Sequence, residues 1–115
     1  MKYGANMSVT GKGKLFHVEL MSSSPAPPAR GNDTWAFKVL DANNQPVSGA
    51  TINVTPYMPD HRHGTQVVPT VMAQPDGSFT VTPLYFFMPG LWTITFDITA
   101  AAGTDSVEYA FCVEG

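Results

Sequence analysis

Hydrophobic and polar residues alternate one by one along several short stretches of this chain. In the clearest stretch, Trp92, Ile94, Phe96 and Ile98 alternate with threonines and one aspartate. Successive side chains of a strand point to opposite faces, so this pattern predicts strands with one buried and one solvated face, as in antiparallel sheets. We expect seven strands, at about residues 13–20, 32–40, 50–56, 66–73, 78–86, 91–98 and 105–113.

Turn-forming residues separate these segments. The chain has 10 glycines and 10 prolines, which leave little room for helices. The stretches 41–46 and 75–77 are typical of hairpin loops, and Gly103 serves the reversal before the last strand. Seven short strands in about 100 residues predict an all-β fold, an immunoglobulin-like antiparallel β-sandwich. The Cys–Trp–Cys signature of antibody domains is absent, since Cys112 is the only cysteine.

The pattern also predicts the domain organisation and the core. Residues 1–12 are expected to be a flexible N-terminal tail, and residues 13–115 a single sandwich domain. The stretch 22–30, with three prolines, is expected to be a long loop. Met72 is expected in the core. The other predicted core residues are Trp35, Phe37, Ile52, Val54, Phe79, Trp92, Ile94, Phe96, Tyr109 and Phe111.

Composition narrows the classes of function. The net charge is -3 and only 13% of residues are charged, with no basic stripe, which argues against nucleic-acid binding. No apolar run has the length of a membrane span, and no leader-like apolar segment follows the first residues. One cysteine excludes an internal disulfide and a CxxC site. Low charge and many threonines and serines, with few lysines and glutamates, favour an extracytoplasmic β domain.

The segment from Met58 to Gly64 concentrates two of the three histidines and a methionine. On an extended backbone His61 and His63 point the same way, with the Met58 thioether nearby. Imidazole with thioether suits copper, above all Cu(I), and Cu(II) through the imidazoles. Asp60 allows a zinc interpretation, which we favour less. The alternative is a polar surface loop whose methionine fills a gap.

Strand direction predicts which loops meet. If consecutive strands are antiparallel, the loops after the first, third and fifth strands share one end of the sandwich. Those loops hold Met58 with its two histidines, Met88, and Met21 at a margin. The last strand also finishes there and brings Cys112 near, although its parity points that side chain outward. The soft candidate ligands therefore gather at one end.

Several turns resemble those of the YtkA-like and FixH-like families. The elements are Phe37–Asp41 followed by Gln45-Pro46-Val47-Ser48-Gly49-Ala50, then Met58-Pro59, Asp76-Gly77-Ser78-Phe79 and Met88-Pro89-Gly90-Leu91-Trp92. The resemblance spans about residues 16–111. It implies a small periplasmic or cell-surface sandwich that handles copper or helps to assemble copper oxidases. It also implies Met58, His61, His63 and Met88 as metal ligands. FixH-type members carry a membrane anchor, which is not seen in this sequence.

Two classes of function follow. The first is a copper-binding carrier or chaperone, whose partners are a copper ion and a protein that accepts it. The second is a non-metal interaction module of an envelope protein, in which the Met58–Gly64 loop is a protein-contact surface. An enzyme is not expected, because no nucleophile elbow, HExxH element or paired carboxylates are present.

Overall fold

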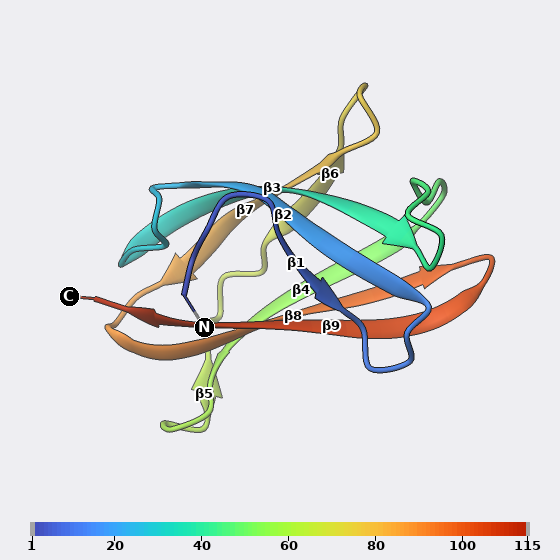
Figure 1. The fold of residues 1–115 in the computed structure, drawn as a ribbon. Coiled ribbons are helices and arrows are strands. Elements are labelled where there is room, and N and C mark those ends of the chain that lie inside the picture. Colours follow the sequence, from blue (N-terminus) through green and yellow to red (C-terminus); the bar gives the residue numbers. More distant parts are fainter. Residues whose placement is uncertain (1, 115) are drawn as a thin grey trace.

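The computed structural model describes residues 2–114, which form nine strands and no helix. Two antiparallel sheets pack face to face (Figure 1), so the predicted antiparallel β-sandwich is confirmed. The strands are β1 (Met7–Thr10), β2 (Phe16–Ser24), β3 (Gly31–Asp41), β4 (Thr51–Met58), β5 (His63–Gly64), β6 (Thr70–Ala73), β7 (Phe79–Phe86), β8 (Gly90–Ala100) and β9 (Gly103–Val113).

The two sheets divide the strands five to four. The first has the order β1-β2-β3-β7-β6, and the second has the order β5-β4-β8-β9. Each of the seven predicted strands has a counterpart, and the additional strands are β1 and β5. The fourth predicted strand is shorter than expected, because only 70–73 pair with β7. The β8–β9 hairpin is antiparallel with continuous register, whereas the β2–β3 hairpin has a register shift between Leu20 and Ser22.

The N-terminal segment differs from its expected form as a tail. Within residues 1–12, β1 pairs with β2 from Met7↔Leu20 to Thr10↔His17. The Tyr109 hydroxyl donates hydrogen bonds to the carbonyl oxygens of Met7 (3.1 Å) and Val18 (2.7 Å), which ties β1 and β2 to the other sheet. Four residues are too few to show a period, so alternation did not reveal this strand.

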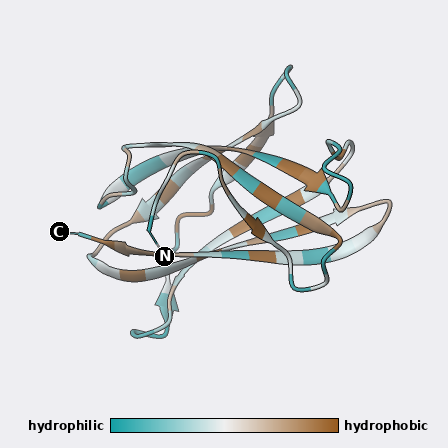
Figure 2. Cartoon of the chain, in the orientation of Figure 1, coloured by the Kyte–Doolittle hydropathy of each residue, from teal (hydrophilic) through white to brown (hydrophobic). Residues whose placement is uncertain are grey.

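The core lies between the sheets and is built from the alternate residues of each strand. Figure 2 shows hydrophobic and hydrophilic bands alternating along the strands, as the sequence pattern predicted. Trp35 lies at its centre, with its ring 5.7 Å from that of Phe111 and 6.2 Å from that of Phe96. All ten predicted core residues other than Met72 are buried. Met72 was placed wrongly: β6 is an edge strand, its inward residue is Val71, and Met72 is 55% exposed.

The connections make the two ends of the sandwich different. β4 and β9 run in the same direction, since both are antiparallel to β8. β7 reaches the start of β8 through only three residues, 87–89. The ends of β4, β7 and β9 therefore lie together, and we call this the Met/His end. The opposite end carries the loop 11–15 and the turn 101–102, which joins β8 to β9.

Candidate metal-binding site

The β4–β5 hairpin forms the outermost part of the Met/His end. Its turn, residues 59–62, begins with a hydrogen bond from the His61 amide to the Met58 carbonyl oxygen (3.2 Å). Pro59 and Asp60 are residues that favour turns, and Arg62 takes the left-handed conformation (φ 55°) that returns the chain to β5. The sequence analysis had placed His61 on an extended backbone. In the structure His61 lies in a turn.

The two histidine rings nevertheless come together. Their centroids are 5.6 Å apart with an angle of 33° between the planes. His61 is exposed and His63 is half-buried. Nδ1 of His63 lies 3.3 Å from the carbonyl oxygen of its neighbour Gly64, and a carbonyl can only accept a hydrogen bond. With Nδ1 donating, the neutral ring carries its lone pair on Nε2, the form in which imidazole binds metals.

Met58 lies inside the protein, with no exposed surface. It pairs with His63 across the hairpin, and directly opposed residues share one face of a sheet. Its methyl group lies against Gly90, where a β-carbon would be only 2.9 Å away. The thioether is thus close to His63 in the fold, but it is part of the core and does not face solvent.

Met88 lies in the short connection from β7 to β8. Its side chain is half-buried and packs against the core. Its backbone is fixed by the Trp92 indole, whose Nε1–H donates to the Met88 carbonyl oxygen at 3.0 Å. The connection also contacts the 25–30 loop, because Nε of Arg30 donates to the Phe87 carbonyl oxygen at 3.2 Å. Met88 therefore belongs to the same end as the histidines, on a backbone held at several points.

Phe87 is a residue of this site that the sequence did not single out. Its ring stacks on that of His63, with centroids 5.5 Å apart and an interplanar angle of 28°. Its other side meets Trp92 edge-on at 5.6 Å. The consecutive aromatic residues Tyr85, Phe86 and Phe87 were a signal, since strict alternation cannot place all three on one strand face. A shallow depression of about 480 Å³ beside the stack is lined by His63, Gly64, Thr65, Gln66, Val67, Tyr85 and Phe87.

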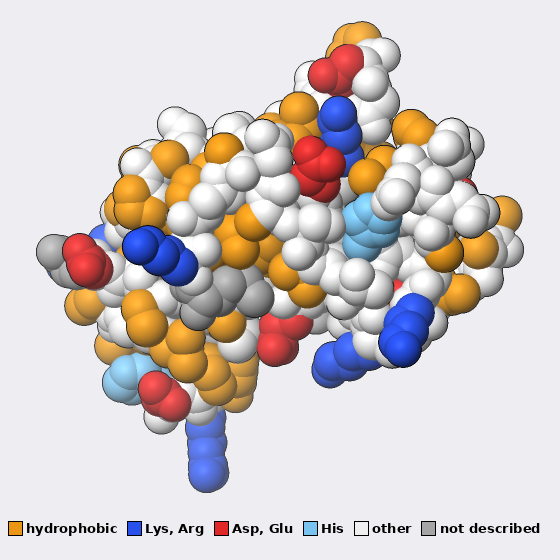
Figure 3. Space-filling model, viewed as in Figure 1, with side chains coloured by type: hydrophobic (Ala, Val, Ile, Leu, Met, Phe, Trp, Pro, Cys, Tyr) orange, Lys and Arg blue, Asp and Glu red, His pale blue; other side chains and the backbone are white. Residues whose placement is uncertain are grey.

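The candidate ligands are two imidazoles at the surface and two thioethers behind them. Within residues 2–114, no three His, Cys, Asp or Glu side chains gather into a group able to hold a metal ion. A metal at this end would therefore need sulfur from methionine, or ligands from another molecule, besides His61 and His63. Figure 3 shows a histidine beside hydrophobic side chains at the lower left, over the hairpin that holds β5.

Two further sulfur-bearing residues lie near the Met/His end. Cys112 is exposed, as its parity predicted, and pairs with Leu91 on the outer side of β9. Met21 lies inside β2, at the bulge between Leu20 and Ser22, and not in the loop that follows. Neither shares the aromatic stack that surrounds His63.

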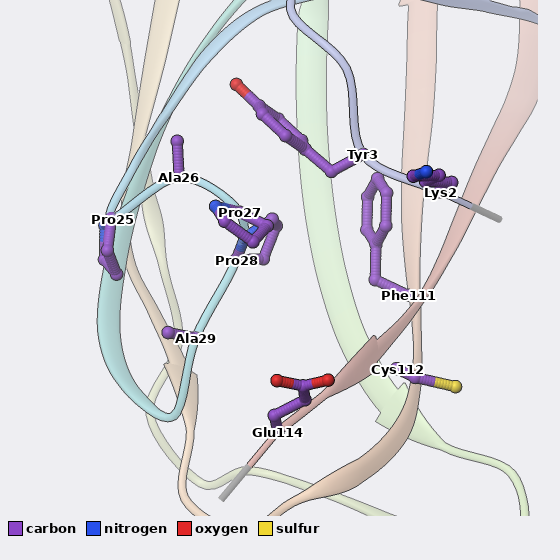
Figure 4. Close-up of a pocket in the computed structure, with 10 residues that line it drawn as sticks. All are labelled: Lys2, Tyr3, Pro25, Ala26, Pro27, Pro28, Ala29, Phe111, Cys112 and Glu114. Carbon is purple, nitrogen blue, oxygen red and sulfur yellow. The ribbon is translucent and has the colours of Figure 1, made fainter.

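A separate apolar pocket of about 510 Å³ lies where the N-terminal segment passes the end of β9. Figure 4 shows Tyr3, Phe111 and the proline-rich loop facing the space between them, with the Cys112 side chain directed away. Lys2 and Glu114 bring one charge of each sign to the lining. The pocket is built from rings and methyl groups, so it has the character of a contact surface rather than of a metal site.

The Met/His end also buries a carboxylate. Asp33, near the start of β3, has no exposed surface, and its Oδ2 accepts a hydrogen bond from the Ala29 amide at 3.0 Å. Its Oδ1 has no partner among the described residues. Burial raises the pKa of Asp33 from its ordinary 3.8 to about 6, against the lowering effect of the Ala29 amide.

Comparison with known proteins identifies the family. The YtkA-like family model matches residues 12–97, which is most of the sandwich and includes all four candidate ligands. The chain belongs to the YtkA-like family. No curated protein and no solved structure matches it. Across residues 2–114 of this YtkA-like domain, no helix is long and apolar enough to cross a membrane.

Proposed function

We propose that this YtkA-like domain is an extracytoplasmic copper-binding carrier rather than an enzyme. The observation that supports the proposal is the pair of imidazoles on the β4–β5 hairpin, 5.6 Å apart, with Nε2 of His63 free to coordinate. Two thioethers, from Met58 and Met88, lie at the same end. Nitrogen and soft sulfur donors suit copper better than the hard cations magnesium and calcium, and zinc is less favoured than copper.

An exposed, incomplete ligand set suits transfer. Two imidazoles leave coordination positions open, so a ligand of an accepting protein can bind the metal before His61 and His63 release it. His61 is exposed and lies on a turn, where an incoming protein can approach it. The proposed partner is therefore a protein that receives copper, and the proposed compartment is the periplasm or another extracytoplasmic space.

The direct experiment measures whether the purified domain retains copper through gel filtration and a chelator wash. We expect about one copper per chain, and we expect the His61→Ala/His63→Ala variant to lose it. His17→Ala is the matched control, since His17 lies on β2, outside the candidate site, and its loss should leave copper binding unchanged. A double variant that binds copper as tightly as the parent would refute the proposal.

The second candidate function is a non-metal interaction module, and the apolar pocket beside Tyr3 and Phe111 favours it. The sequence had suggested the Met58–Gly64 loop as the contact surface of such a module. In the form that the pocket favours, a binding partner instead inserts an apolar side chain there, and the histidines play no part. Tyr3→Ser, which changes a half-buried residue of the lining and leaves the buried Phe111 in place, would then abolish partner binding while His61→Ala/His63→Ala would not. Under the copper hypothesis the double histidine variant loses the metal and the pocket variant retains it.

A further inference from the structure

Three side chains form a row on the inner face of the four-stranded sheet at the Met/His end. His63 pairs with Met58, and the register Tyr57↔Thr93 places Met58 beside Trp92 on the next strand. Neighbouring strands are about 4.8 Å apart, so the backbones of His63 and Trp92 are about 10 Å apart, with the Met58 backbone between them.

Phe87 contacts both outer members of this row. Its ring centroid is 5.5 Å from that of His63 and 5.6 Å from that of Trp92. A ring in contact with both neighbours of Met58 is therefore placed where it can cover Met58. The following residues close the remaining side, since the Met58 methyl lies against Gly90. This arrangement explains why a methionine at the end of an outer hairpin has no exposed surface.

We propose that Phe87 determines the metal preference of this site by covering the Met58 thioether. The inference rests on the proposed function of copper binding. With Phe87 in place, the Met58 thioether is withheld and a metal meets the imidazoles of His61 and His63, which accept Cu(II). When Phe87 turns aside, the thioether of Met58 joins them, and the set then favours Cu(I).

The covered state lowers the apparent affinity for Cu(I). A ligand that needs a minor conformation binds more weakly, in proportion to the population of that conformation. Phe87 is half-buried and follows the end of β7, so its ring is less enclosed than those of Phe86 or Trp92. Removal of the ring should therefore increase Cu(I) affinity, in a way that depends on Met58, and leave Cu(II) affinity nearly unchanged.

The first experiment needs no copper. The apoprotein is treated with hydrogen peroxide, which converts an accessible thioether to the sulfoxide, and each methionine is followed by mass spectrometry. Met72, 55% exposed, serves as the internal reference. We expect Met58 to oxidise at least about tenfold more slowly than Met72 in the parent, and at a comparable rate in Phe87→Ala.

Two variants control for loosening of the whole end. Phe87→Leu keeps apolar bulk over Met58 and should give an intermediate rate. Tyr85→Ala removes a neighbouring ring, 5.9 Å from that of Phe87. Among the described residues Tyr85 contacts no aromatic ring other than that of Phe87, so Met58 should stay protected. Equal acceleration in Tyr85→Ala and Phe87→Ala, or no acceleration in Phe87→Ala, would overturn the covering role.

The second experiment titrates Cu(I) and Cu(II) against competing chelators. Phe87→Ala should bind Cu(I) about tenfold more tightly than the parent, and Met58→Leu in that background should remove the gain. A gain that survives Met58→Leu would overturn the inference. If the parent binds copper but Met58 is not oxidised faster in Phe87→Ala, the covering role of Phe87 is refuted while the proposed copper binding stands. Absence of copper binding in every protein would refute the proposed function and the selectivity role together.

Discussion

The two ends of the sandwich each bury an aspartate near the start of a strand, and they surround its carboxylate differently. At the opposite end, Asp105 accepts hydrogen bonds from the amides of Gly13 (2.7 Å), Leu15 (2.9 Å), Phe16 (3.2 Å) and Ser106 (2.8 Å). At the Met/His end, Asp33 accepts one from Ala29 and keeps an oxygen without a partner among the described residues.

The difference in hydrogen bonding decides the direction in which the pKa of each carboxyl is shifted. Burial alone raises the pKa of Asp105, but its amide partners together outweigh burial and hold the pKa below the ordinary value. For Asp33, burial prevails and the pKa rises to about 6. At the opposite end the hydrogen bonds of the buried carboxylate are therefore satisfied, whereas at the Met/His end Oδ1 of Asp33 has no partner among the described residues. A buried carboxylate oxygen without a partner marks a place where the fold leaves hydrogen-bonding capacity unused.

The largest expected effect tests whether the Met/His end is nevertheless part of the rigid core. Trp92 is fully buried, with its ring 5.2 Å from that of Phe86. Trp92→Ala should lower the free energy of unfolding by about 3–5 kcal/mol, because it leaves a large cavity. Denaturant unfolding checks this, with Val68→Ala as a surface control, since Val68 is 83% exposed. A variant as stable as the parent would mean that this end is not packed as described.

Much of the sandwich was predictable because burial on one face leaves a period of two in the sequence. That signal gave seven strands and the core around Trp35, and it placed Cys112 outward. It did not show β1 or β5, which are too short to carry a period. It also placed Met72 inside, which was wrong because β6 is an edge strand and its residues are exposed on more sides than those of a central strand. The Phe87 stack depends on backbone beyond the end of β7, where alternation no longer applies.

The next effect concerns the hydrogen-bonded carboxylate of Asp105 at the opposite end. Asp105→Asn replaces a charged acceptor with an amide whose NH₂ group faces backbone N–H groups, so it should cost about 2–4 kcal/mol. In the parent, the depressed pKa of Asp105 means that its contribution is present at neutral pH and is lost as pH falls below about 4. Unfolding curves of both proteins at neutral and acidic pH measure this, and a loss of stability in the variant that does not shrink in acid would contradict it.

The third prediction concerns proton competition at the proposed copper site. Protons and copper compete for the same imidazole lone pairs, so copper affinity should fall by about tenfold or more between pH 7.5 and 5.5. Thioethers do not titrate, so part of any Cu(I) binding should persist at the lower pH. Chelator competition at several pH values gives the profile. A flat profile would exclude His61 and His63 as ligands.

The contribution of Asp33 to the stability of the fold should depend on pH in the opposite direction from that of Asp105. Because the pKa of Asp33 is raised to about 6, the folded protein binds a proton that the unfolded chain binds only near 3.8. Stability should therefore rise as pH falls from about 6 to 4, on account of Asp33. Asp33→Asn should remove this slope and stabilise the domain by about 1–2 kcal/mol at pH 7. A less stable variant at pH 7 would show that the charge of Asp33 supports the 25–30 loop.

The smallest effect sharpens the distinction between outer imidazoles and inner thioether. Met58→Leu keeps hydrophobic bulk and removes sulfur, so it should weaken Cu(I) by about threefold to tenfold and change Cu(II) little. The effect is modest because Phe87 covers Met58 for most of the time. Competition titrations with both oxidation states decide this, and an equal loss for Cu(I) and Cu(II) would remove Met58 from the ligand set.

The contact between Met58 and Gly90 restricts how this sequence can drift among its relatives. Gly90 has a positive φ of 134°, and a β-carbon there would lie 2.9 Å from the Met58 methyl. The backbone conformation at position 90 favours glycine by itself, and a β-carbon there would in addition force the end of the Met58 side chain to move, although 31 residues separate the two positions along the chain. Across YtkA-like sequences the two positions should vary together: where position 90 is not glycine, position 58 should hold a shorter side chain, and the thioether should be lost with it.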